Sequence, residues 1–283
     1  MGIDKRAIEP TLQLGAMGYF TNFESVIELG SQDLHFESID ERSTIFTIIK
    51  DGLKIDDNSL QTVVNEALKK ATPDEFGSEW LYHLIGFRKY QCIDGDGRFG
   101  ANIWDLNYAV PENHINKYDL VTNHGTTEHV FNIFQAFKNI HDLTRVNGIM
   151  LHVVPFQGYV NHGFFNFQPD FFIDLAKENS YEIIQINVTI GGWNKRVLSW
   201  NAETFQTAFQ VGMNANLEVV MRKSSDKQFK IPFNGIYGGV NCLLPGYKES
   251  YTSQFRRRLI FIFFGKPSSK LRKMISTIQN FSR

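Results

Sequence analysis

Short runs of apolar and β-branched residues alternate with stretches of helical periodicity along this chain, and this alternation constrains its fold more than any other feature. The two most apolar runs, YDLVTN at 118–123 and GIMLHVVPF at 148–156, are nearly continuous. Such strands are typical of parallel sheets that helices cover on both faces. The pattern therefore predicts an α/β protein with a largely parallel sheet.

Seven segments have the length and composition of strands in such a sheet. They are SVIELG at 25–30, KYQCID at 89–94, ANIWDL at 101–106, YDLVTN at 118–123, GIMLHVVPF at 148–156, YEIIQINV at 181–188 and NLEVVMRK at 216–223. Helical spacing is found at 60–71, at 76–85 before Gly86, after Thr127, and from Pro169 onward. Glycine is common just after a helix and proline in its first turn, so Gly86 and Pro169 mark two of these boundaries.

Composition narrows the class of protein. The chain has 283 residues, 42% hydrophobic and 21% charged, with a formal net charge of −1. A near-neutral chain has no overall attraction to nucleic acid, and its two cysteines are too few for a disulfide framework. Charges in the segment MGIDKRAIEP argue against a signal peptide, and no run approaches the roughly 20 apolar residues of a membrane span. We expect a cytoplasmic protein.

Polar residues follow several of the predicted strands, where open α/β sheets bind their ligands. Asp94 at the end of the second strand can accept hydrogen bonds from a ribose diol, although Asp96 is an equally placed acid. Asp105 at the end of the third can accept from an adenine amino group while Leu106 packs on the ring. Together these residues predict a site for an adenosine group.

The turn after the first strand, in VIELGSQD at 26–33, lacks the glycine-rich signature of dinucleotide sites. A pyrophosphate needs Gly-x-Gly-x-x-Gly so that the backbone and a helix N-terminus can surround it. Here Gly30 is the only glycine of that pattern. S-adenosylmethionine has an adenosine group and no pyrophosphate, so it is the ligand that this combination favours.

From about Met17 to Tyr237, the chain resembles the class I S-adenosylmethionine-dependent methyltransferases. The resemblance is carried by YDLVTNHGTTEHVFN at 118–132 and GIMLHVVPFQGYVNHGFFNFQPDFFIDLAKENSYEI at 148–183. These segments are similar to a subgroup common in bacterial pathways for surface polysaccharides and secondary metabolites. The resemblance implies a Rossmann-like, seven-stranded methyltransferase sheet with helices on both faces and an antiparallel last strand.

The resemblance also implies which residues bind the cofactor, S-adenosyl-L-methionine. They are Glu28, Gly30, Gln32, Asp94, Asp105, Leu106, Asn123, His124 and Gly125. The chain departs from the family in the first motif, where Ser31 and Gln32 replace further glycines of the fuller form. This departure concerns how the methionine end of the cofactor is held.

Methyl transfer to an alcohol is helped by a general base. His129, His162 and Glu128 are the predicted catalytic residues, because the loops after the fourth and fifth strands are expected to converge over the methyl group. Each histidine has a structural alternative as a hydrogen-bonded wall residue, and Glu128 can instead stabilise a helix N-terminus. His124, Glu128 and His129 match no known metal-ligand spacing, so no metal is predicted. The phenylalanines at 164–172 line either an acceptor pocket or the core.

We expect a methyltransferase domain at 1–237 with a helical insertion at about 35–88, followed by a basic extension at 238–283. That extension is interpreted either as a solvated helix pair or as a contact for an acidic partner, an anionic substrate or a membrane surface.

The expected reaction is methylation, at oxygen, of a small-molecule or sugar-derived acceptor. An anionic acceptor, such as a phosphorylated or nucleotide-linked precursor of a surface polysaccharide, would suit the basic extension. Two alternatives belong to other classes: a nicotinamide-dependent oxidoreductase, and a methyltransferase-like binding subunit without activity. The missing Gly-x-Gly-x-x-Gly argues against the first. The presence of Asp94, Asp105 and the turn from Asn123 to His129 argues against the second.

Overall fold

The computed structural model describes residues 2–3, 5–34, 77–190, 196–200 and 214–234, together with residues 56, 58 and 62. The chain divides into two compact units, Met1–Val240 and Asn241–Arg283, and all described residues belong to the first. Most of the predicted insertion and all of the basic extension lie outside the described residues, so these two expectations stay predictions. None of the described helices combines the length and the hydrophobicity that a membrane crossing requires.

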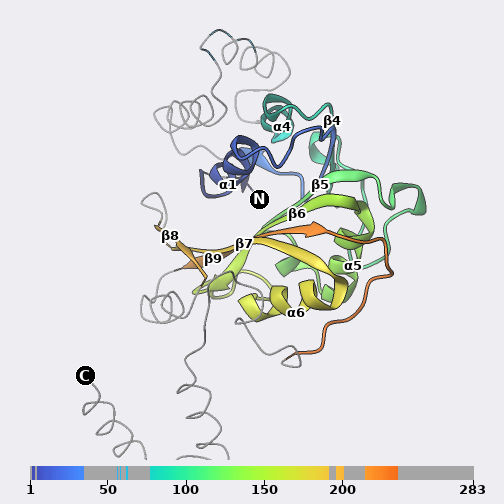
Figure 1. Ribbon diagram of the computed structural model, residues 1–283, viewed down its shortest axis with the longest axis vertical. Coiled ribbons are helices and arrows are strands. Elements are labelled where there is room, and N and C mark those ends of the chain that lie inside the picture. Colours follow the sequence, from blue (N-terminus) through green and yellow to red (C-terminus); the bar gives the residue numbers. More distant parts are fainter. Residues whose placement is uncertain are drawn as a thin grey trace, which may run out of the picture. The chain divides into compact units, whose positions relative to one another are not determined.

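A mixed sheet of seven strands, in the order β4-β2-β5-β6-β9-β7-β8, forms the centre of the first unit (Figure 1). The strands are β2 Ser25–Leu29, β4 Lys89–Ile93, β5 Tyr118–His124, β6 Thr144–Gln157, β7 Tyr181–Ile190, β8 Arg196–Ser199 and β9 Ala215–Lys223. β2 pairs in parallel with β4 and β5, and β5 pairs in parallel with β6. β9 runs antiparallel between β6 and β7, which confirms the predicted seven-stranded sheet with a reversed last strand.

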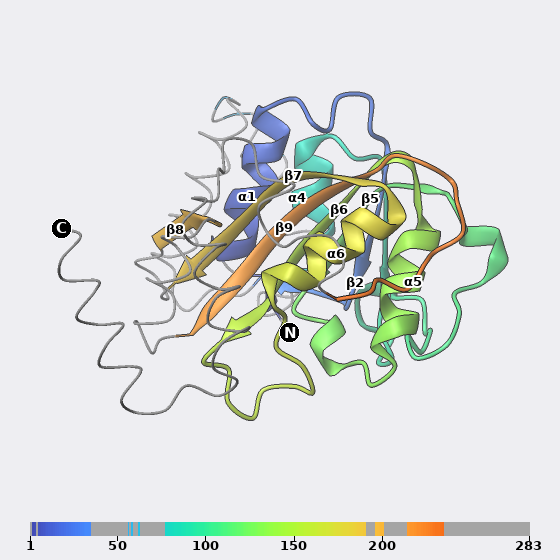
Figure 2. The ribbon, with the colours of Figure 1, turned by 60° about the horizontal axis from the view of Figure 1, so that its bottom comes forward.

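Helices cover both faces of this sheet, as predicted. α1 (Lys5–Ala16) and α4 (Glu79–Ile85) lie on one face, and α5 (Ile133–Leu143) and α6 (Pro169–Asn179) lie on the other (Figures 1 and 2). α4 ends at Gly86, whose φ is 112°, and α6 begins with its proline. α1 was not predicted from the sequence. Shorter elements are β1 Gly2–Ile3, β3 Asp33–Leu34 and the 3₁₀ turns η1 Arg98–Gly100, η2 Glu112–His114 and η3 Thr127–His129.

The predicted third strand, ANIWDL at 101–106, is wrong. Within it Asn102 makes a single bridge with Ile93, and the chain then turns. Asp105 accepts hydrogen bonds from both the backbone and the side-chain nitrogen of Asn107, at 2.9 and 2.7 Å. Short polar side chains of this kind compete with strand pairing by satisfying the backbone locally. The seventh strand is β8 instead, which pairs antiparallel with β7 at the sheet edge.

Successive side chains of a strand point to opposite faces of the sheet. Because helices cover both faces here, the central strands are apolar on both sides. Leu120 of β5 and Ile149 and Leu151 of β6 belong to a buried cluster that includes Leu14 of α1 and Tyr82 of α4. The intervening side chains point to the opposite face, toward α5 and α6. There the ring of His152 lies 5.6 Å from that of Phe137 and 5.1 Å from that of Phe172.

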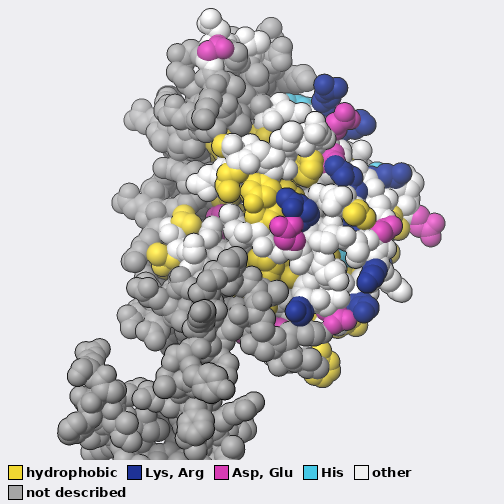
Figure 3. Space-filling model, viewed as in Figure 1, with side chains coloured by type: hydrophobic (Ala, Val, Ile, Leu, Met, Phe, Trp, Pro, Cys, Tyr) yellow, Lys and Arg dark blue, Asp and Glu magenta, His cyan; other side chains and the backbone are white. Residues whose placement is uncertain are grey.

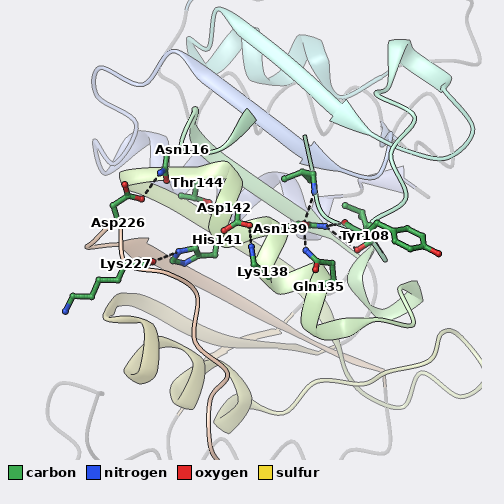
Figure 4. A network of polar contacts seen from close by, with 12 residues as sticks. Tyr108, Asn116, Gln135, Lys138, Asn139, His141, Asp142, Thr144, Asp226 and Lys227 are labelled. Carbon is green, nitrogen blue, oxygen red and sulfur yellow. Dashed lines mark hydrogen bonds and ion pairs between the residues drawn. The ribbon is translucent and has the colours of Figure 1, made fainter. Parts of the chain in front are cut away.

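Residues 224–234, here called the strap, follow the reversed strand β9 and run along α5 and α6 (Figure 2). The strap is attached to the domain by polar contacts along its length. These are Asp226 with Asn116, Lys227 with His141, Lys230 with Asn179, and Asn234 with Asp174. Figure 4 shows the first two of these contacts on the side of α5.

The face of the molecule in Figure 3 carries hydrophobic side chains near its middle, with basic and acidic side chains interspersed around them. Neither sign of charge dominates the visible described surface.

Lys223, the last residue of β9, is a buried cation that joins β9 to the ends of α5 and β6. Its side chain is 1% exposed, and its Nζ donates to Asn116 Oδ1, His141 O and Thr144 O at 2.7, 2.9 and 2.9 Å. Burial lowers the pKa of Lys223. Three acceptors, with Asp226 3.7 Å away, compensate for the lost hydration of the charge.

Replacing Lys223 by Met should lower the free energy of unfolding by on the order of 3 kcal/mol, because buried acceptors lose their donor. Urea unfolding of the two proteins measures this difference. Lys227→Met, at an exposed position of the strap, is the matched control and should change stability by less than about 0.5 kcal/mol. Equal stability of the two variants would contradict a stabilising role for Lys223.

Candidate active site

The turn after β2 is bonded to the end of the neighbouring strand β4. Gly30 adopts a φ of +84° and donates its N–H to Ile93 O at 2.8 Å. Ser31 donates its backbone N–H and its hydroxyl to Asp94 Oδ2, at 2.8 and 3.0 Å. Burial acts to raise the pKa of Asp94, but the hydrogen bonds from Ser31 and from the backbone of Asp96 and Gly95 outweigh it, and the pKa is lowered. A carboxylate is therefore held at the end of β4.

The same turn is bonded to the end of β5 on its other side. Thr126 Oγ1 donates to Leu29 O at 2.7 Å, and Gln32 Nε2 donates to His124 O at 3.1 Å. A Cβ on Gly30 would lie 2.5 Å from Gln32 Nε2 and 2.7 Å from Thr126 Oγ1, so only glycine allows this close approach. Ser31 and Gln32, which depart from the glycine-rich pattern, are thus the residues that tie the three strand ends together.

Gln32 Oε1 is buried without a hydrogen-bond partner among the described residues. Buried acceptors are normally satisfied by protein, water or ligand. This amide oxygen and the Asp94 carboxylate both lie at the carboxyl ends of the parallel strands. The edge therefore suits a ligand that donates hydrogen bonds and carries positive charge.

Asn123, His124 and Gly125 lead from β5 into the η3 turn. Asn123 Oδ1 accepts from Thr127 N at 3.1 Å, while its Nδ2 donates to Thr127 Oγ1 at 2.9 Å. Asn123 thus shapes the turn that carries Glu128 and His129. Gly125 has a φ of 68° and donates to Val153 O of β6.

Asp105 and Leu106 lie in the loop that replaces the predicted third strand. Asp105 is exposed and Leu106 is buried. The loop is docked on the start of α5, because Asn107 Oδ1 accepts from Asn132 N at 2.9 Å. Asn139 Nδ2 of α5 also donates to Leu106 O. Asp96, the alternative ribose acid, is exposed and accepts from Arg98 N at 2.9 Å.

Glu28 lies inside β2 and is fully buried. Its carboxyl accepts from Tyr82 at 3.0 Å, from Tyr90 at 2.9 Å and from Ser78, so it joins α4 to the sheet beneath the turn. Burial raises the pKa of Glu28 to about 7, although the three hydroxyl donors act in the opposite sense. The sequence did not single out Ser78, Tyr82 or Tyr90, since hydroxyl residues on a helix or strand carry no distinctive spacing.

The three predicted catalytic residues do come together. Glu128 Oε1 lies 3.6 Å from His162 Nε2 and 3.9 Å from His129 Nε2, and the two imidazole rings are 5.0 Å apart. The Glu128 side chain is 1% exposed, whereas those of His129 and His162 are 35% and 39% exposed. Burial raises the pKa of Glu128 to about 7. The pKa of His129 is lowered, mainly by burial and to a smaller extent by the nearby positive charge of His162.

Two further histidines, His124 and His152, lie deeper in the fold. His152 is 1% exposed within β6, and burial lowers its pKa to about 3. Its Nδ1 is 3.2 Å from Asn123 Nδ2, so the neutral ring accepts this hydrogen bond. His152 is thus packed in the core. His124 is 6% exposed and contributes its backbone oxygen to the tie with Gln32.

A cavity of about 710 Å³ lies between α5 and α6. Phe165, Phe167 and Phe171 line it, whereas Phe172 is buried and Phe164 is 64% exposed. Pro232 and Asn234 of the strap line it from the other side. The aromatic segment 164–172 therefore divides between core packing and a cavity wall.

No protein-family model and no curated protein matches this chain. A SAM-dependent methyltransferase structure from Archaeoglobus fulgidus is 10% identical, with 77% of this chain and 94% of that chain covered and a TM-score of 0.38. The O-methyltransferase from a trans-AT PKS multienzyme of Brevibacillus brevis, in complex with S-adenosyl-L-homocysteine, is 12% identical, with 78% and 73% covered and a TM-score of 0.38. The cyclase SpnF is 9% identical, with 77% and 82% covered and a TM-score of 0.37. Similarities this weak assign neither a family nor an activity.

Glu28 should make stability depend on pH. Its pKa is raised in the folded protein, so its contribution is fully present below about pH 4.5 and is lost as the pH rises through about 7. Between these limits the free energy of unfolding should fall by on the order of 3 kcal/mol through this residue. Urea unfolding of the natural protein and of Glu28→Gln at several pH values measures the contribution of Glu28 to this pH dependence.

Glu128 also has a raised pKa and contributes to the slope of the free energy of unfolding against pH in both proteins. The contribution of Glu28 is therefore the difference between the slopes of the natural protein and Glu28→Gln. Glu24→Gln, on an exposed residue just before β2, is the control and should leave the natural slope in place. Parallel slopes for the natural protein and Glu28→Gln would show that Glu28 does not titrate in this range.

Proposed function

We propose that this protein transfers a methyl group from S-adenosyl-L-methionine to an oxygen atom of a small-molecule acceptor. The observation that carries the proposal is a set of hydrogen bonds, here called the three-way tie, that joins the carboxyl ends of β2, β4 and β5. It consists of the bonds from Ser31 to Asp94, from Thr126 to Leu29 and from Gln32 to His124. It combines one tight glycine turn with the Asp94 carboxylate and with Gln32 Oε1, which has no hydrogen-bond partner among the described residues. The ligand that fits has ribose hydroxyls and a cationic amino-acid end, and it needs no pyrophosphate site.

In this proposal Asp94 accepts from the ribose hydroxyls, because the bonds from Ser31 hold its carboxylate at the strand end. Gln32 receives the methionine end, and the turn from Asn123 to Gly125 lies beside the methyl group. Asp105 and Leu106 are proposed for the adenine, on a loop that α5 supports. Glu28 supports the site from below, since its carboxyl bonds hydroxyl groups of α4 and β4.

Methyl transfer is an in-line displacement at a carbon that the sulfonium makes electrophilic. Much of the rate acceleration in such a reaction comes from aligning the nucleophile with the methyl group. We assign activation of the acceptor hydroxyl to Glu128, His129 and His162, which lie together beside the Asn123 to Gly125 turn. The partial exposure of the two histidines leaves them accessible to an acceptor.

For the acceptor we propose a sugar-derived molecule, phosphorylated or nucleotide-linked, from a pathway for surface polysaccharides or secondary metabolites. The support is the sequence resemblance of 118–132 and 148–183 to methyltransferases of such pathways. The cavity between α5 and α6 has aromatic walls and the acidic side chains of Asp170 and Asp174, so it suits the uncharged sugar part of such an acceptor rather than its phosphate.

The cofactor is tested by isothermal titration with S-adenosylhomocysteine and with NAD. We expect S-adenosylhomocysteine to bind and NAD not to bind. Asp94→Asn should weaken binding tenfold or more, because it removes charge-assisted hydrogen bonds worth about 1.5 to 3 kcal/mol.

Asp96→Asn is the matched control, since this acid is exposed two residues away. A larger effect of Asp96→Asn would move the ribose contact to that residue. Binding of NAD in place of S-adenosylhomocysteine would replace the proposal by the oxidoreductase alternative. Binding of neither ligand would favour a subunit without cofactor.

The role of the catalytic cluster is tested with His129→Ala. We expect kcat for an identified acceptor to fall by about 100-fold, as is typical when an acid–base group is removed, with cofactor affinity nearly unchanged. His83→Ala, at an exposed position of α4, is the control and should keep full activity. A loss smaller than tenfold would make His129 a wall residue.

A further inference from the structure

Two loops that are far apart in sequence bring three ligand-type atoms into one small space. Glu128 and His129 belong to the η3 turn after β5, whereas His162 comes from the loop after β6. One carboxylate oxygen and one ring nitrogen from each histidine all lie within 4.8 Å of one another. Ligand atoms of a tetrahedral zinc site, about 2.1 Å from the metal, are about 3.4 Å apart. The distances of 3.6 and 3.9 Å from Glu128 Oε1 need only a small contraction to reach this value.

The Glu128 carboxyl is the feature that calls for a ligand. It is 1% exposed, and neither of its oxygens has a hydrogen-bond partner within the described part of the chain. The two histidine nitrogens are beyond the usual hydrogen-bond range of about 2.7 to 3.2 Å. A buried carboxyl in this state is costly, and an ion is one of the groups that resolve it. Glu28 shows the contrast, because three hydroxyl groups donate to its equally buried carboxyl.

The backbone holds His162 against Glu128 by contacts of its own. Phe164 N and Phe165 N both donate to Glu128 O, at 2.8 and 3.3 Å. A Cβ on Gly163 would lie 2.9 Å from Glu128 O and 3.1 Å from Glu128 Cγ, so a glycine there permits the approach. The approach of the two loops is therefore built into the fold and does not depend on the histidine side chains.

We propose that Glu128, His129 and His162 bind one divalent first-row transition-metal ion. Two imidazoles and one carboxylate suit Zn²⁺, Co²⁺, Mn²⁺ or Fe²⁺ better than Mg²⁺, which prefers oxygen ligands alone. Three protein ligands leave further coordination positions open, as in catalytic rather than structural metal sites. The sequence did not reveal this set because its third member is His162 and not His124, and the pairing of the two loops is a tertiary feature.

The role of the ion rests on the proposed function, whereas its binding does not. An acceptor hydroxyl oxygen in an open position would have a lowered pKa and would lose its proton to solvent. The resulting alkoxide attacks the methyl carbon. A carbon–oxygen bond forms, the carbon–sulfur bond breaks, and the sulfur keeps that electron pair to give S-adenosylhomocysteine. The products are a methyl ether, S-adenosylhomocysteine and one proton.

The test measures metal binding to the full chain without cofactor. Protein stripped by dialysis against a chelator is titrated with Co²⁺, followed by its visible absorbance, and with Zn²⁺ by calorimetry. We expect one equivalent to bind, and Glu128→Gln, His129→Gln and His162→Gln each to weaken binding 100-fold or more. His83→Gln, which removes an exposed histidine elsewhere, is the control and should bind as the natural protein does.

Circular dichroism and thermal melting check the fold of each variant. His162→Gln remains informative if Glu128→Gln does not fold, because its side chain is 39% exposed. Absence of binding, or natural affinity in His162→Gln, would overturn the metal site.

Methylation assays before and after chelation separate the two proposals. Loss of activity on chelation, restored by Co²⁺ or Mn²⁺, supports both. Metal binding with no methylation of any acceptor leaves the site standing and overturns the proposed function. Methylation that persists in stripped protein overturns the catalytic role of the ion and leaves the proposed function intact.

Discussion

The hydrogen bond from Thr126 Oγ1 to Leu29 O is the constraint on which the rest of the site depends. It joins the loop after β5 to the end of β2, and Gln32 reinforces it by donating to His124 O. The approach requires a residue without a side chain at Gly30. On the other side, Ser31 extends the tie to Asp94. These contacts therefore connect the ends of all three strands through one short turn.

The buried carboxyl groups of Glu28 and Glu128, which lie near these strand ends, differ in the hydrogen-bond donors around them. Glu28 is surrounded by hydroxyl donors and serves to attach α4 to the sheet. Glu128 has two half-exposed histidines near it and no hydrogen-bond donor among the described residues. Since an unsatisfied buried carboxyl costs free energy, the first arrangement stabilises the fold and the second is suited to a ligand.

Much of the sheet was predictable because the central strands are buried on both faces and are therefore apolar without interruption. β5 and β6 were predicted for this reason, and Gly86 and Pro169 marked helix boundaries for reasons of local geometry. The segment at 101–106 was mistaken for a strand because its apolar residues hid the turn that Asp105 and Asn107 make. β8 at the edge was missed, because a short edge strand has little pattern of its own.

The sequence by itself determined the class of sheet and the chemical types of residue at the strand ends. Through its resemblance to a known family, it also indicated that the last strand is antiparallel. These follow from local periodicity and from short motifs. Only the tertiary structure decided that Glu128, His129 and His162 meet, that Ser31 and Gln32 tie the strand ends together, and that Glu28 accepts from the Tyr82 hydroxyl of α4. These contacts join residues far apart in the chain, so their distances depend on strand register and loop approach rather than on spacing in the sequence.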